Sequence, residues 1–236
     1  QESRIWIGYR NTILYTVLGT LFNLCLTIPA GYVLSKKHLI GRKILTFYFL
    51  VTMYFGGGMI PTYLVIKSMG LINQPYTLVI LGGISVYNLI ITRVFFQSSI
   101  PEEIYEAVNI DGANEFLSFF RIALPLAKPI IAVMALYYSV GHWNAYFDAL
   151  LYVSRASYQP LQMILRSILV LNESALAMLD PNLMEVDMVL ELTRRTYLAE
   201  TMKYALIFIA SAPLLALYPF VQKYFVKGVM IGSLKG

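Results

Sequence analysis

The sequence predicts an all-α membrane protein that crosses the bilayer about five times. Of its 236 residues, 58% are hydrophobic and 13% are charged, whereas a soluble domain carries about 25% charged residues. The mean hydropathy is +0.65. Five apolar runs reach the roughly 20 residues that a helix needs to cross a bilayer. A soluble globular protein is therefore excluded.

The predicted spans cover residues 11–34, 44–66, 75–96, 126–150 and 202–222. Glycine and proline inside these runs are compatible with helices, because neighbouring helices can satisfy the freed backbone groups. The second span contains three consecutive glycines at 56–58. This run either opens the helix near mid-membrane, as in transporters with broken helices, or packs closely against a neighbouring helix.

The loops between the spans set the orientation. The first loop, residues 35–43, has four basic residues and no acid: Lys36, Lys37, Arg42 and Lys43. The positive-inside rule places it in the cytoplasm. Alternation then puts segments 67–74 and 151–201 outside, and segment 97–125 and the tail 223–236 inside. If the native N-terminus is cytoplasmic, one further helix precedes Gln1 and the intact protein has six.

All 236 residues form one predicted transmembrane domain. The outer segment 151–201 is too polar to span. Apolar residues at helical spacing over 159–172 predict an amphipathic helix on the membrane or on the outer face of the protein. The single cysteine, Cys25, excludes a disulfide within the chain, and its apolar surroundings predict a small core residue.

Residues 100–125 form a polar island between apolar spans, on the predicted cytoplasmic side. Pro101 and the two acids that follow it are typical of a helix start. Asp111 and Gly112 predict a tight turn, because glycine adopts a positive φ without strain. The island is too short and too charged to cross the membrane.

A second short helix is predicted after the turn. Asp111 or Asn114 caps it, and it stops at Pro125. Carboxylates lie on one face of the resulting helix–turn–helix. The other face carries Ile104, Val108, Phe116, Phe119 and Phe120. Such an element indicates docking with another protein; the alternative is an amphipathic interfacial helix over 102–121.

The spacing within the island resembles the EAA loop of the permease subunits of binding-protein-dependent ABC importers. That loop has Glu-Ala-Ala, three residues, Gly, nine residues, Ile, one residue and Leu-Pro. The matching residues are Glu106, Ala107, Val108, Gly112, Ile122, Leu124 and Pro125. Val108 in place of the second Ala is the one departure. From about residue 11 to its end, the chain is also similar to carbohydrate-uptake permeases of the maltose-transporter type.

This resemblance implies the fold of a type I ABC importer permease, whose loop is a coupling helix held in a cleft of an ATP-binding subunit. The residues with implied coupling roles are Glu103, Glu106, Ala107, Val108, Asp111, Gly112, Ala113, Ile122, Leu124 and Pro125. ATP and Mg belong to the partner ATPase subunits, since this chain has no Gly-x-x-x-x-Gly-Lys-Ser/Thr loop. We expect the chain to be a transport subunit rather than an enzyme, without a cofactor or metal of its own.

The resemblance also implies partners and a location. The partners are a second permease subunit, two ATP-binding subunits, an extracytoplasmic solute-binding protein and membrane lipid, with no nucleic acid. The location is the plasma (inner) membrane of a bacterium. The cargo is a sugar or oligosaccharide moved into the cytoplasm by alternating access, and the chain looks like permeases for polysaccharide-derived oligosaccharides such as alginate. Four Arg against six acids in segment 151–201 provide no net positive field for an acidic sugar.

Polar and aromatic residues in the spans are candidates for the substrate path, because sugar hydroxyls pair with polar groups and sugar faces stack on aromatic rings. The predicted path residues are Tyr54, Gly57, Tyr87, Asn88, Tyr138, Trp143, Asn144 and Asp148. Helical spacing places Asn144 and Asp148 on one face of the fourth span. Hydrogen bonding between helices is the alternative role, and the partner permease is the alternative place for the sugar contacts.

Other functions are open at this point. An ion-coupled secondary transporter would place acids at mid-membrane, whereas Asp148 lies near an outer end of its span. An ABC importer permease for a non-sugar substrate would share the loop. A membrane enzyme or an assembly scaffold would leave the spacing of the loop unexplained.

Overall fold

The computed structural model describes residues 2–110 and 112–167, residue 170, and helical positions at 194, 197, 201, 204, 205, 208, 211–213 and 215. It does not describe the side chains at 2, 3, 102, 106, 107 and 109. Most of the predicted fifth span, much of segment 151–201 beyond residue 170, and the tail 223–236 lie outside the described residues. Within the described part the chain is helical and contains no strand, as expected for an all-α protein.

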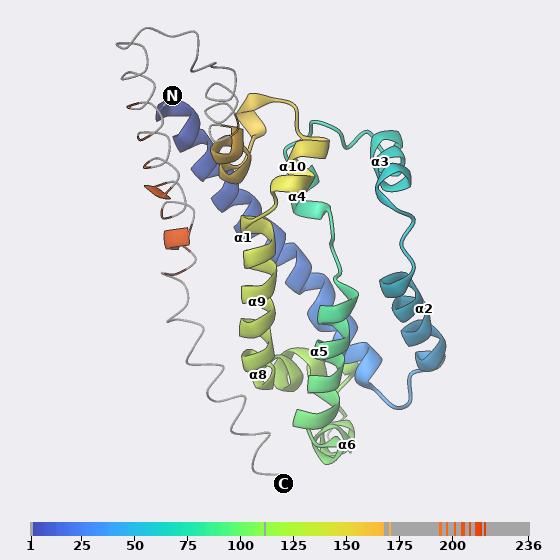
Figure 1. Ribbon diagram of the computed structural model, residues 1–236. Helices are drawn as coiled ribbons and strands as arrows, with labels where there is room; N and C mark the ends of the chain where they lie inside the picture. The colour runs from blue at the N-terminus through green and yellow to red at the C-terminus, as the bar shows by residue number, and fades with distance from the viewer. Residues whose placement is uncertain are drawn as a thin grey trace, which may run out of the picture.

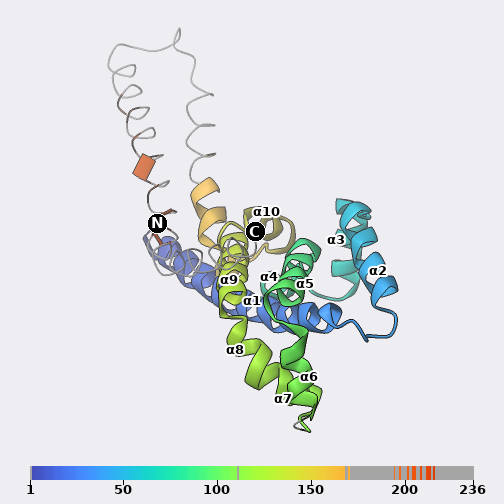
Figure 2. The same cartoon turned by 90° about the horizontal axis from the view of Figure 1, so that it is seen from below.

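The first predicted span is the central helix α1 (Glu2–Ser35), which packs along α5 (Val86–Ser99) and α9 (Lys128–Trp143), as Figures 1 and 2 show. It begins well before residue 11, and its 34 residues are about 50 Å long at 1.5 Å per residue. Among the described residues, Arg4–Ser35 is the one unbroken helix long and apolar enough to cross a membrane.

Helix α1 is polar toward the protein and apolar toward its surroundings. Thr12, Asn23 and Thr27 are almost fully buried, whereas Leu18 is half exposed. Lipid chains are as apolar as leucine, so polar and small side chains serve the contacts between helices. Cys25 is exposed, and the expectation that it lies in the core is wrong because it belongs to the outward side of this helix.

The second span is broken into α2 (Arg42–Tyr54) and α3 (Met59–Ser68), which meet at an angle of 113°. The glycine run lies in the break, where Gly58 has a φ of +87°. A Cβ atom built at Gly56 or Gly58 would meet nothing within 4 Å among the described residues. The glycines therefore open the helix, and no described helix packs closely against them.

The third span is also divided, into α4 (Thr77–Ile80) and α5, rather than forming one helix over 75–96. The side-chain amide of Asn23 donates hydrogen bonds to the backbone oxygens of Gly82 and Gly83, over 3.0 and 2.9 Å. Ser85 then caps α5 by accepting a bond from the Asn88 N–H. The break exists because polar groups of another helix satisfy its backbone.

The fourth span differs from the predicted 126–150 in a similar way. Helix α9 ends at Trp143, and the chain re-forms a helix as α10 (Tyr146–Tyr152). The predicted stop at Pro125 is wrong, since α8 (Leu124–Leu126) continues past the proline before a bend of 77° into α9. Counting each bent pair as one span gives up to three spans among the described residues, against the five predicted from the whole sequence.

The basic first loop and the polar island lie at the same end of the molecule. Figure 1 shows α6 (Glu102–Ile110) and α8 near the end of α1, with α3, α4 and α10 at the opposite end. This arrangement agrees with the predicted orientation, which places segments 35–43 and 97–125 together in the cytoplasm.

The start of the predicted amphipathic helix at 159–172 lies on the protein. Residues 161–167 are helical. Leu161 and Leu165 are buried with Trp143, against Ile5 and Tyr9 of α1. The apolar side of this segment therefore packs against α1 and Trp143, as the alternative on the face of the protein predicted.

Candidate functional site

The polar island folds into a short helix, a turn and a second helical segment. Helix α6 follows Pro101 and is anchored by Tyr105, which is 9% exposed in a core that also contains Phe96 and Phe119. The second segment runs through α7 (Glu115–Ser118), the π-helical turn η1 (Phe119–Ala123) and α8. We call residues 100–125 the coupling loop, after the resemblance that its sequence carries.

The turn closes as its glycine predicts. Gly112 has a φ of +76°, and the Ala113 N–H donates to the backbone oxygen of Val108 over 3.2 Å. A left-handed glycine followed by a bond that spans six residues is the Schellman arrangement that ends many helices. Gly112 therefore ends α6 and reverses the chain within a few residues.

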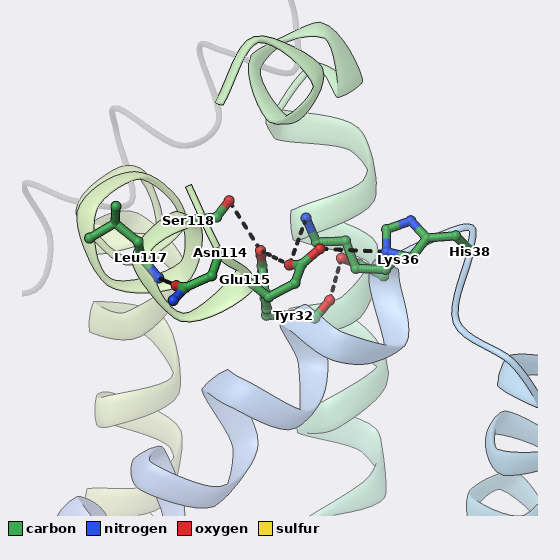
Figure 3. Close-up of polar contacts among 8 residues, drawn as sticks. Tyr32, Lys36, His38, Asn114, Glu115, Leu117 and Ser118 are labelled. Carbon is green, nitrogen blue, oxygen red and sulfur yellow. Dashed lines mark hydrogen bonds and ion pairs between the residues drawn. The ribbon is translucent and has the colours of Figure 1, made fainter. Parts of the chain in front are cut away.

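Asn114, rather than Asp111, caps the second helix. Its side-chain oxygen accepts a hydrogen bond of 2.9 Å from the Leu117 N–H (Figure 3). An N-cap of this type satisfies one of the free N–H groups in the first turn. Asp111 lies outside the described residues.

The coupling loop is attached to the end of α1 through Glu115. Its carboxylate accepts a hydrogen bond of 3.0 Å from the Tyr32 hydroxyl and lies 3.6 Å from the Lys36 ammonium (Figure 3). His38 Nε2 lies 3.5 Å from the other carboxylate oxygen, and the Tyr32 hydroxyl is 3.4 Å from Ser118 Oγ. We call Tyr32, Lys36, Glu115 and Ser118 the Glu115 cluster.

Aromatic rings complete this attachment. The Lys36 ammonium lies 3.4 Å from the centre of the Tyr105 ring and 4.5 Å from that of Tyr32, so it also makes cation–π contacts. The Tyr32 ring in turn contacts the rings of Phe96 and Phe119. Burial, followed by the negative charge of Glu115, raises the pKa of Tyr105 to about 12, so this phenol is neutral at physiological pH.

Sequence reasoning missed the Glu115 cluster. It used Lys36 only to orient the chain and gave Tyr32 no role. The available signal was weak: a tyrosine and a lysine four residues apart at the cytoplasmic end of a span, and an acid in a distant loop. Nothing in the sequence pairs these positions.

The free end of the coupling loop exposes large apolar side chains. Ile110 is 85% exposed, Phe116 77% and Phe120 60%. We call these three residues the apolar tip. The predicted apolar face is therefore divided, since Phe119 is buried, and Ile104 and Val108 are half-buried. Large exposed apolar side chains on a loop that also carries charge are typical of an interaction surface.

The other predicted coupling residues differ in exposure. Glu103 and Pro125 are exposed. Half-buried positions are Val108, Ala113, Ile122 and Leu124. The side chains of Glu106 and Ala107 lie outside the described residues, as does Asp111. The coupling role of these positions stays a prediction.

The predicted path residues are divided between exposed and buried positions. Tyr54, Tyr87, Asn144 and Asp148 are exposed, as is Gly57 in the break of the second span. Buried members are Asn88, Tyr138 and Trp143. Helix α9 ends before Asn144, and Asp148 belongs to α10, so the prediction that both share a face of one helix is wrong.

Tyr138 has a role between helices. Its hydroxyl lies 2.7 Å from Thr27 Oγ1 of α1 and accepts a bond of 3.3 Å from the Ser85 N–H. This is the alternative role that the sequence left open. A path role for the exposed members stays a prediction.

Comparison with known proteins identifies the family of this chain. Residues 5–231 match the family described as binding-protein-dependent transport system inner membrane component. The chain is 44% identical to protein LplC of Bacillus subtilis (strain 168), over 95% of this chain and 72% of that protein. It is 40% identical to the polygalacturonan/rhamnogalacturonan transport system permease protein YtcP of the same organism, over 95% of this chain and 75% of that protein.

A solved structure resembles the fold as well. It is the crystal structure of a bacterial ABC transporter involved in the import of the acidic polysaccharide alginate. One chain of that structure matches this chain with a TM-score of 0.79 and 33% sequence identity. The match covers 94% of this chain and 75% of that one. The chain therefore belongs to the family of inner membrane components of binding-protein-dependent transport systems, and it is a transport subunit of the inner membrane.

Proposed function

We propose that this chain is the permease subunit of an ATP-driven importer for oligosaccharides derived from complex, acidic polysaccharides. The observation that supports the proposal is the coupling loop, which carries an EAA-type motif and exposes the apolar tip. A relative named for polygalacturonan and rhamnogalacturonan transport and a solved neighbour involved in alginate import support the substrate class.

In this proposal, the apolar tip docks into a cleft on a partner ATPase subunit. Two such subunits bind ATP and Mg and close together, and a second permease subunit completes the membrane path. The solute-binding protein delivers the oligosaccharide to the outer side. Closure of the ATPase pair moves the coupling loops and turns the permease pair from inward-facing to outward-facing.

Exposed polar groups of this chain would line part of the path. Tyr54 and Tyr87 offer rings and hydroxyls, and Asn144 offers an amide. Asp148 is acidic and would repel a uronate carboxylate nearby. We therefore assign recognition of the substrate's charge to the binding protein and the second permease, and assign contacts with neutral hydroxyls to this subunit.

Transport by the reconstituted complex tests this proposal. The chain is co-expressed with the second permease, the ATPase subunit and the solute-binding protein, and the complex is placed in liposomes. Uptake and ATP hydrolysis are then measured with oligogalacturonides, oligoalginates and neutral oligosaccharides of equal length. We expect the acidic oligosaccharides to stimulate both activities. Stimulation by neutral oligosaccharides alone would overturn the substrate class, and uptake that follows an ion gradient without ATP would overturn the ATP-driven mechanism.

A further inference from the structure

We infer that the Glu115 cluster joins the coupling loop to α1, so that the loop and α1 move as one body and α1 carries the motion across the membrane. The inference rests on the proposed docking of the loop to an ATPase. It assigns a positioning role to Glu115 and Lys36, which lie outside the residues that carry the EAA resemblance.

The first step is the energetics of the cluster. The Lys36 side chain is only 11% exposed, although it carries a charge. Burying an ammonium is costly unless a counter-charge and polar contacts compensate it. The Glu115 carboxylate supplies a counter-charge, and the rings of Tyr32 and Tyr105 add cation–π contacts. Separating the loop from α1 would leave this charge without its carboxylate, so the two elements resist separation.

The second step is what α1 holds further along its length. Near its middle, Asn23 bonds the break between α4 and α5 and lies 2.7 Å from His142 of α9. Thr27 bonds Tyr138 one turn away. These contacts attach α4, α5 and α9 to α1.

The third step is the outer end of α1. The Asn11 amide donates to the backbone oxygens of Ser157 and Gln159, over 2.8 and 3.1 Å. Thr12 Oγ1 accepts a bond of 2.8 Å from the Leu161 N–H. If the coupling loop moves α1, the movement therefore also reaches residues 157–161 and the break between α4 and α5.

Variants that remove a charge from the Glu115 cluster test this attachment in the reconstituted complex. Glu115→Gln keeps an acceptor for Tyr32 but removes the counter-charge, and Lys36→Met keeps most of the side chain's volume. We expect both variants to retain the bound ATPase subunit and to lower substrate transported per ATP hydrolysed about three- to tenfold, the scale of one typical hydrogen bond. Arg121→Gln is the matched control, because Arg121 is an exposed charge on the same loop and belongs neither to the residues with implied coupling roles nor to the Glu115 cluster. We expect its ratio of substrate transported to ATP hydrolysed to stay at the wild-type value.

A cross-link tests whether the loop and α1 move together. The pair Lys36→Cys and Glu115→Cys is made with Cys25→Ser, and a short bifunctional thiol reagent joins the two positions. We expect the uncross-linked pair to couple poorly and the cross-link to restore transport per ATP. Loss of transport on cross-linking, with the ATPase subunit still bound, would show that the loop must leave α1 and would overturn the inference.

The variants also separate this inference from the proposed function. If both Glu115→Gln and Lys36→Met transported as much substrate per ATP as the wild type, the inference that the Glu115 cluster joins the loop to α1 would be overturned. The proposed docking of the loop to the ATPase subunit would be unaffected. A wild-type chain that never retains an ATPase subunit would instead overturn the proposed function.

Discussion

The imidazole Nε2 of His142 lies 2.7 Å from the side-chain oxygen of Asn23, and this contact fastens α9 to α1. The ring fits because residue 19, one turn before Asn23 on α1, is glycine. A Cβ atom built at Gly19 would lie 2.4 Å from the His142 ring. The absence of a side chain at position 19 is therefore a requirement of the helix packing.

Replacing Gly19 with alanine is expected to destabilise the protein. The added methyl must displace the His142 ring and its bond to Asn23, and such overpacking costs about 1–3 kcal/mol. Thermal unfolding of the purified protein, followed at one fixed heating rate, should show a lower midpoint. Gly141→Ala is the matched control, because a Cβ atom there meets nothing within 4 Å among the described residues. Equal midpoints for the two variants would contradict the packing account.

The bond between Thr27 and Tyr138 can be measured with a double-mutant cycle. Thr27→Val and Tyr138→Phe each remove one hydroxyl, and Tyr138→Phe is expected to cost more because Ser85 also loses its acceptor. We expect a coupling free energy of about 0.6 kcal/mol, the typical size for such bonds in membrane proteins. Strictly additive effects on the unfolding midpoint would show that the two hydroxyls do not interact.

Gly112 should tolerate asparagine far better than valine. Its φ of +76° is strained for side chains, most of all for β-branched ones, whereas Asn adopts this region more readily. We expect Gly112→Val to reduce copurification of the ATPase subunit several-fold and Gly112→Asn to retain most of it. Wild-type copurification by the valine variant would mean that the turn does not position the coupling loop.

The features that the sequence predicted correctly depend on neighbouring residues. The turn at Gly112 and the cap at Asn114 are local chemistry, and both lie where the residue types place them. The cytoplasmic location of the loop, inferred from the charge of segment 35–43, stays a prediction.

The features that it missed depend on residues far apart in the chain. The break between α4 and α5 is held by Asn23, 59 residues before Gly82. Tyr32 meets Glu115 across 83 residues. A hydropathy pattern shows which segments are apolar. It contains no information on which distant side chain bonds the backbone of a broken helix or pairs with a charged residue.

ATP hydrolysis by the reconstituted complex, with and without substrate-loaded binding protein, tests the coupling loop most directly. The variant is Phe116→Ser with Phe120→Ser, which removes two rings of the apolar tip, and the control is Phe147→Ser on α10 at the opposite end. We expect the tip variant to lose the ATPase subunit and all stimulated hydrolysis, while the control keeps the subunit bound. Full stimulation with an intact subunit in the tip variant would contradict the assignment of residues 100–125 as the coupling loop.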